Sequence, residues 1–201
     1  MSIGRALKRL VKPTRKVESR SGTGSSLEQT RVIRGELPRL LASYRVRKLL
    51  DLPCGDFHWM GSVDLSGMDY LGGDIDAEII DDIRRRFARP RVSFARIDIL
   101  NEVPPKADLV LCRDCLVHFS FHDIRRALDN LGRSGATYLL TTTFTRDEEN
   151  TDISTGDWRP LNLTLAPFAF PPSLTLINEG CTEGKGRWAD KSLGLWRLAD
   201  L

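Results

Sequence analysis

The chain has 201 residues, which is enough for one ordinary domain and short for two. Hydrophobic residues make up 41% of it, as in a typical globular protein, and no apolar run approaches the roughly 18 residues of a membrane span. The formal net charge of +3 is too small to indicate a nucleic-acid partner by itself. Composition therefore predicts one globular domain and argues against a membrane-spanning helix.

Positive charge is concentrated at the N-terminus. Basic residues crowd positions 5–20, opposed there only by Glu18, and a small, flexible stretch follows at positions 21–24. We therefore expect residues 1–24 to form a basic, flexible arm and residues 25–201 a single domain. Apolar residues of the arm can share one helix face, so three interpretations stay open: a solvated disordered arm, a presequence of mitochondrial type, or an interfacial helix that makes weak contact with an anionic membrane surface.

The cysteines give no sign of a disulfide framework or a metal site. Cys54, Cys112, Cys115 and Cys181 are too few for such a framework in a chain of this length. Cys112 and Cys115 form a CxxC pair, but no second CxxC or HxxxH motif completes a zinc set, so we expect packing roles and no metal. The N-terminal sequence also lacks the pattern of a secretory signal, which favours a cytoplasmic protein.

Apolar periodicity predicts alternating helices and strands from Ser25 onward. Ser25 and Glu28 have the spacing of a capping box, and a helix with its apolar face at Val32, Ile33, Leu37, Leu40 and Leu41 should follow. Further helices are expected at residues 56–63, 76–88 and 121–131. Strands are expected at residues 48–52, 70–74, 92–97, 108–112, 137–144, 174–177 and 193–198.

This order predicts an α/β fold. We expect a doubly wound, mainly parallel seven-stranded sheet with helices on both faces, closed by a C-terminal antiparallel strand pair. Ligands of such sheets lie at the carboxyl ends of the strands. The first predicted strand ends in Asp51-Leu52-Pro53-Cys54-Gly55, where Gly55 lets the backbone approach a ligand and Pro53 fixes the turn. The alternative is an ordinary strand-to-helix turn.

The loop resembles motif I of class I S-adenosylmethionine-dependent methyltransferases, an acidic residue followed by GxGxG. Asp51 and Gly55 match the acidic residue and the second glycine, whereas Pro53 and Phe57 replace the first and third. Loss of the third glycine argues against a dinucleotide. The resemblance covers roughly residues 49–144 and is closest to a bacterial subgroup with a DxPCGDFxWM loop, here Asp51 to Met60.

Two further strand ends extend this resemblance. Asp74 matches the motif II acidic residue, which implies bonds to the ribose hydroxyls of S-adenosylmethionine, although Asp76 could instead cap the following helix. Asp98 resembles the residue that accepts from the adenine amino group. The resemblance thus implies S-adenosylmethionine as cofactor and the following binding residues: Asp51, Pro53, Cys54, Gly55, Asp74, Ile75, Asp98, Ile99 and Arg113.

Two residues after the fourth strand are candidate general bases. Oxygen acceptors often need a base, whereas a neutral amine does not. Asp114 and His118 fall at motif IV, where the family brings the methionine end of the cofactor close to the acceptor. The alternative for His118 is a packing residue at a helix start.

A long loop after the fifth strand offers candidate acceptor-binding residues. Its Asp157, Trp158, Arg159 and Asn162 suit a hydroxylated acceptor, because carboxylate and amide groups bind hydroxyls and an indole packs on a ring face. The alternative is a loop that merely packs over the sheet edge, with Arg159 paired to an acid.

These observations predict a methyltransferase acting on a hydroxyl group of a small molecule or glycan. An N-methyltransferase and a non-catalytic cofactor-binding or scaffold protein are the alternatives. The absent GxGxxG disfavours a nucleotide-dependent oxidoreductase or nucleoside-sugar enzyme. A nucleic-acid acceptor is disfavoured because the basic residues lie in the arm and not among aromatic residues of the domain. The oligomeric state is not specified.

Overall fold

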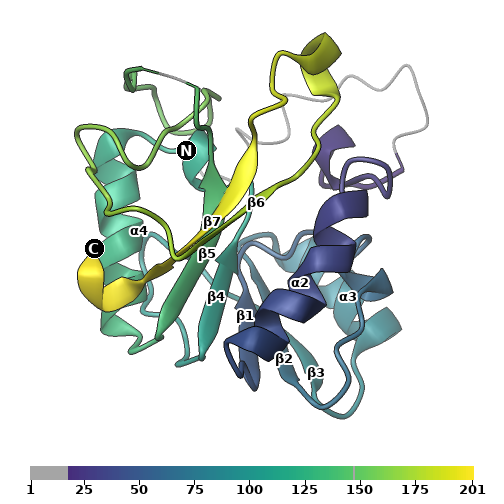
Figure 1. The fold of residues 1–201 in the computed structure, drawn as a ribbon. Coiled ribbons are helices and arrows are strands. Elements are labelled where there is room, and N and C mark those ends of the chain that lie inside the picture. Colours follow the sequence, from purple (N-terminus) through teal and green to yellow (C-terminus); the bar gives the residue numbers. More distant parts are fainter. Residues whose placement is uncertain (1–17, 147) are drawn as a thin grey trace.

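The computed structural model describes residues 18–146 and 148–201. Seven strands form one mixed sheet in the order β3-β2-β1-β4-β5-β7-β6 (Figure 1). Neighbours among β1 to β5 are parallel, whereas β7 is antiparallel to both β5 and β6. The fold class predicted from the sequence is therefore confirmed. The strands are β1 (Lys48–Asp51), β2 (Asp69–Asp74), β3 (Val92–Arg96), β4 (Leu109–Cys112), β5 (Tyr138–Thr143), β6 (Thr175–Asn178) and β7 (Ser192–Arg197).

Three α-helices cover the two faces of the sheet. Helices α2 (Arg31–Ser43) and α3 (Ala77–Phe87) lie on one face and α4 (Phe121–Arg133) on the other (Figure 1). Alternate strand residues feed two hydrophobic cores, so Leu49 packs in the α2 and α3 core while its neighbour Leu50 packs in the α4 core. All four residues of β4 are buried, as expected for a central strand covered on both faces.

The start of the first helix differs from the prediction. Helix α2 begins at Arg31, and Ser25 lies in a short 3-10 turn, Thr23–Ser25. The predicted capping box is therefore wrong. Ser26 instead organises the approach to the helix, because its hydroxyl accepts from the Gln29 amide and its carbonyl accepts from the Thr30 hydroxyl. The predicted apolar face is right, since four of its five members are buried and Val32 packs against them.

The predicted helix at residues 56–63 is also wrong. Phe57 has a left-handed φ of 59°, which no α-helix tolerates, and only a 3-10 turn forms at Met60–Ser62. Burial explains the irregular path. The Phe57 ring packs against Tyr70, Phe87 and Phe94 with ring centroids 5.0–5.3 Å apart. These aromatic contacts stabilise a backbone conformation that local helix propensity does not favour.

The segment between β5 and β6 contains no helix or strand across residues 148–172, yet it is well packed. Leu161, Leu163 and Phe170 are buried in the α4 core. The segment is therefore an ordered part of the domain. Among the described helices, none combines the length and apolarity needed to cross a membrane. The proposed membrane-contacting face of the arm lies in residues 1–17, outside the described residues.

Candidate active site

A cavity of about 980 Å³ opens at the carboxyl ends of the parallel strands. This is the edge at which the sequence places a ligand, and the volume is in the range of small-molecule sites. Twelve of the predicted site residues line the cavity: Asp51, Pro53, Cys54, Gly55, Asp74, Ile75, Asp98, Ile99, Arg113, Asp114, His118 and Trp158.

Asp51 ends β1 as a buried carboxyl group, 2% exposed, at the wall of the cavity. Burial raises its pKa to about 7, against the opposing effect of a hydrogen bond from the Tyr70 hydroxyl. That bond joins Tyr70 Oη to Asp51 Oδ2 at 2.7 Å. A buried carboxyl group with one hydrogen-bond donor is poised to ionise when a cation approaches.

The loop after β1 is tied to the end of β2. Gly55 has a left-handed φ of 54°, and its amide donates to Asp74 Oδ2 at 3.1 Å. Asp74 Oδ1 accepts from the Asp76 amide at 2.9 Å. Burial raises the pKa of Asp74, although these backbone bonds oppose the change. Each carboxylate oxygen retains a further lone pair for a ligand.

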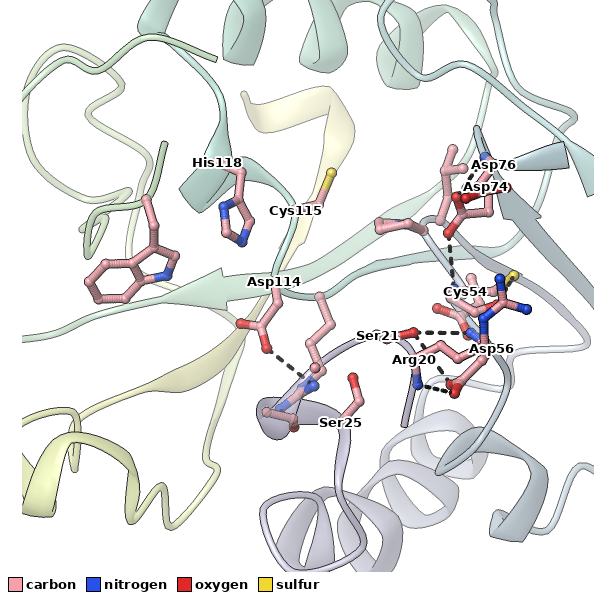
Figure 2. Close-up of a pocket in the computed structure, with 18 of the residues that line it drawn as sticks. Arg20, Ser21, Ser25, Cys54, Asp56, Asp74, Asp76, Asp114, Cys115 and His118 are labelled. Carbon is pink, nitrogen blue, oxygen red and sulfur yellow. Dashed lines mark hydrogen bonds and ion pairs between the residues drawn. The ribbon is translucent and has the colours of Figure 1, made fainter. Parts of the chain in front are cut away.

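The competing residue, Asp76, has a structural role. It is the N-cap of α3, and its Oδ1 accepts from the Glu78 and Ile79 amides. Asp74 is therefore the better placed carboxylate for a ligand at this strand end. The two lie side by side at one end of the cavity, away from Asp114 and His118 (Figure 2).

Asp98 follows β3 and organises its own turn. Its two carboxylate oxygens accept from the Leu100 amide and the Asn101 side chain. Ile99, next to it, is buried and lines the cavity. The turn therefore presents the Asp98 carboxylate beside an apolar surface.

Residues 18–25, here called the strap, pack on the loop after β1, and residues 20–25 line the cavity (Figure 2). The Asp56 carboxylate accepts from the Arg20 amide at 2.7 Å and from the Ser19 hydroxyl at 2.9 Å. A Cβ on Gly55 would collide with the Ser21 hydroxyl. The strap, at the end of the predicted arm, thus contributes to the lining of the site.

A cluster of four charged side chains, three of them buried, lies at the end of the cavity away from Asp74. Arg113 donates to Glu179 at 2.6 Å and contacts Asp114 at 3.2 Å. Lys191 contacts Asp114 at 2.6 Å and Glu179 at 3.6 Å. Arg113 also donates to the Gly24 carbonyl, so this cluster anchors the strap. Arg113 therefore acts by holding the site together.

This cluster argues against Asp114 as a general base. Burial alone would raise the pKa of Asp114, but Arg113 and Lys191 hold it well below its usual range. A carboxylate held so strongly in its ionised form is a weak proton acceptor. The Asp114 side chain is 30% exposed at the cavity and can still accept a hydrogen bond from a ligand.

His118 has the environment of a neutral imidazole. Burial lowers its pKa, against the effect of a bond to the backbone carbonyl of Asp157. That carbonyl lies 2.9 Å from Nδ1, so Nδ1 carries the proton and Nε2 keeps its lone pair. None of the described residues forms a hydrogen bond to Nε2.

The loop at residues 155–162 contributes the Asp157 carbonyl, the Arg159 side chain and the Trp158 ring to the site. Asp157, Arg159 and Asn162 do not line the cavity, in contrast to their predicted contact with the acceptor. Arg159 is buried and donates to the Leu116 and Phe119 carbonyls, which fixes the turn that bears His118. Asn162 is also buried, and its Oδ1 accepts from Thr164. Only Trp158 of the four predicted residues reaches the cavity.

Sequence reasoning missed several cavity residues because they are distant in the chain. Trp188, Lys191 and Glu183 come from the segment before β7, and the strap comes from the predicted arm. The one sequence signal was the mixture of charged and aromatic residues in the last quarter of the chain.

All four cysteines are buried and free. In the part of the chain that the structure describes, no group of three His, Cys, Asp or Glu side chains is arranged to hold a metal ion.

Comparison with known proteins identifies a methyltransferase domain in the chain. Residues 49–135 match a family model described as a methyltransferase domain. Among solved structures, the methyltransferase domain of bacterial CtHen1-C has a TM-score of 0.63 at 14% identity, covering 86% of this chain and 98% of that one. N-methyltransferase NodS from Bradyrhizobium japonicum has a TM-score of 0.59 at 17% identity, with 87% and 98% covered.

Human N-acetylserotonin methyltransferase, solved with S-adenosylmethionine, has a TM-score of 0.57 at 14% identity. That match covers 97% of this chain and 65% of the human one. At such identities these three likenesses establish a shared fold. No curated protein sequence matches the chain.

Proposed function

Because this chain carries a class I, S-adenosylmethionine-dependent methyltransferase domain, we propose that it methylates a hydroxyl group of a small molecule or glycan, with His118 as the general base. One observation carries the proposal. The Asp157 carbonyl holds the Nδ1 proton of His118, which leaves the Nε2 lone pair available at the wall of the cavity. A positioned neutral imidazole is the usual proton acceptor at neutral pH.

The residues at the strand ends fit the cofactor. S-Adenosylmethionine, when bound, supplies a sulfonium methyl group and carries an ammonium group, two ribose hydroxyls and an adenine amino group. We assign Asp51 to the ammonium, Asp74 to the ribose and Asp98 to the adenine amino group, because each needs an acceptor and these three carboxyl groups line the cavity. Ile75 and Ile99 line the same cavity and offer apolar contact to the adenine ring.

The other predicted site residues have supporting roles. Pro53, Cys54 and Gly55 shape the backbone next to Asp51, and the Gly55 amide is bonded to Asp74. Arg113 holds the strap and Asp114 in place. Asp114, kept ionised by two cations, accepts a hydrogen bond from the acceptor and orients it.

The proposed base makes a kinetic prediction. Removal of a general base lowers turnover by about 10²–10⁴-fold and leaves ground-state binding nearly unchanged. His118→Gln should therefore lose kcat and keep its affinity for S-adenosylmethionine. Because burial lowers the pKa of His118, wild-type turnover should fall only at a pH below the ordinary histidine pKa, where the ring becomes protonated.

The experiment supplies labelled S-adenosylmethionine together with separate pools of hydroxylated small molecules, glycans and amines. Variants His118→Gln and His122→Gln are compared, because His122 lies exposed at the start of α4 and does not line the cavity. We expect label in the hydroxylated pools, lost in His118→Gln alone. Full kcat in His118→Gln would show that no base is needed there, and label in the amine pool alone would assign nitrogen methylation instead.

A further inference from the structure

Three aromatic side chains gather at the end of the cavity where the acceptor is proposed to bind. Phe144 follows β5, Trp158 lies in the next loop, and Trp188 precedes β7. The Trp158 and Trp188 ring centroids are 4.7 Å apart, and those of Phe144 lie 6.1 and 5.9 Å from them. All three pairs pack edge to face, the arrangement that aromatic rings prefer. We call these three residues the aromatic wall.

One residue of the wall is exposed. Phe144 is buried and Trp188 is half-buried, but the side chain of Trp158 is 39% exposed. An indole this exposed in a concave site offers a large apolar area to a ligand. Its backbone is fixed, because the neighbouring Arg159 is buried and bonds to two carbonyls of the His118 turn. A preordered ring loses little conformational entropy on binding.

The charges around the wall argue against a cationic ligand. The Arg187 guanidinium lies 4.5 Å from the Trp188 ring centroid, so a cation already covers that ring. Among the described residues, Arg113 and Lys191 line this end of the cavity. Their charges are opposed by the carboxylates Asp114, Glu179 and Glu183. Because a neighbouring cation already opposes each of these carboxylates, a cationic ligand gains little at this end.

We propose that the methyl acceptor is an uncharged aromatic ring that bears the hydroxyl group, with the ring packed on Trp158 and the hydroxyl directed to His118. This proposal rests on the proposed hydroxyl methylation and narrows its acceptor to one chemical class. A flat ring matches an exposed indole face better than a saturated sugar ring does, because both of its faces are apolar. Asp114 would accept a hydrogen bond from a second donor on the ring.

The test measures binding without methyl transfer. Protein saturated with S-adenosylhomocysteine is titrated by calorimetry with 2-naphthol, catechol and 5-hydroxyindole, and with cyclohexanol, methyl glucoside and phenethylamine as non-aromatic, sugar and cationic comparisons. We expect the hydroxylated aromatic compounds to bind at least tenfold more tightly than the comparison compounds. Trp158→Ala should weaken them at least tenfold and Trp158→Phe less, since phenylalanine keeps a ring.

Trp196→Phe is the matched control, because Trp196 is buried in the α4 core and does not line the cavity. It should leave the affinity for the aromatic probes unchanged. Equal binding of cyclohexanol and 2-naphthol, or full affinity in Trp158→Ala, would overturn the proposal. The two proposals can fail separately. If the aromatic probes bind but methyl label appears only in the amine pool, the proposed hydroxyl methylation is refuted. If glycans are methylated but the aromatic probes do not bind, the proposed aromatic acceptor is refuted.

Discussion

Affinity for S-adenosylmethionine should depend on pH through Asp51. Burial raises the pKa of this carboxyl group to about 7 in the free protein. If its ionised form faces the cofactor ammonium, protonation at low pH removes the attraction and weakens binding. The sign is therefore fixed: affinity should rise with pH through the pKa of Asp51.

The size of the effect follows from the ionised fraction. With a pKa of about 7, roughly 3% of Asp51 is ionised at pH 5.5 and about half at pH 7.0. If only the ionised form binds, affinity should increase about 15-fold over that interval. The upper limit of pH 7.0 is chosen because the cofactor's own α-amino group titrates near roughly pH 8.

Calorimetric titration at pH 5.5, 6.0, 6.5 and 7.0 measures this dependence. Asp51→Asn should bind weakly and equally at each pH, and it retains His118, so any contribution of that ring appears in both proteins. Tyr70→Phe removes the hydrogen bond that lowers the pKa of Asp51. The rise in affinity should then begin at higher pH. A flat profile in the wild type, matching Asp51→Asn, would refute the assignment of Asp51 to the ammonium.

The same raised pKa affects the free protein in the opposite sense. A folded-state pKa of about 7, above the ordinary 3.8, means that the folded state binds the Asp51 proton more tightly than the unfolded chain does. That contribution to stability is complete below pH 4 and is lost as the pH rises through 7. Asp51→Asn should therefore raise the Tm of the cofactor-free protein at pH 8 more than at pH 4, and cofactor binding should offset the difference.

Three substitutions test other parts of the site. Asp56→Ala removes the hydrogen-bond acceptor that holds the strap, so S-adenosylmethionine should bind about tenfold less tightly and dissociate faster in stopped-flow fluorescence. An unchanged dissociation rate would mean that the strap does not retain the cofactor. Gly55→Ala combines a left-handed φ with a collision at Ser21 and should cost about 1–3 kcal/mol in urea denaturation, whereas a neutral result would mean that the strap moves aside freely. Glu179→Gln leaves Arg113 and Lys191 undercompensated in a buried cluster, and a loss of about 3–5 kcal/mol is expected in the same assay; a loss under about 1 kcal/mol would show that water reaches the cluster.

The parts of the fold that could be predicted from the sequence depend on local patterns. Short runs of apolar and β-branched residues predicted all seven strands. The signal is clearest for β4, because a strand buried on both faces needs apolar side chains at successive positions. The carboxyl groups of Asp51, Asp74 and Asp98 were found in the same way, because each comes at or just after the end of a strand. Parallel strands then bring these ends to one edge of the sheet.

The errors arose where distant residues decide the local structure. Ser25 is followed three residues later by Glu28, as in a capping box, yet its segment is held by Arg113 through the Gly24 carbonyl. Arg159 looked like a ligand donor because its loop is polar, but its bonds go to carbonyls about 40 residues earlier. Likewise, the sequence around Asp114 does not predict its contact with Lys191, which lies 77 residues later. Periodicity and propensity carry no information on such contacts.

The two halves of the site therefore rest on different kinds of structure. The proposed cofactor contacts come from strand ends, whose positions are fixed by the ladder of the sheet. The proposed acceptor contacts come from the loop after β5 and the segment before β7. The loop after β5 has two roles, because Arg159 fixes the turn that bears His118 and Trp158 is the exposed residue of the aromatic wall. A change confined to residues 155–162 would then alter the acceptor without altering the cofactor site. Because Arg159 ties the base to the wall, acceptor binding and proton removal should change together when this loop is replaced.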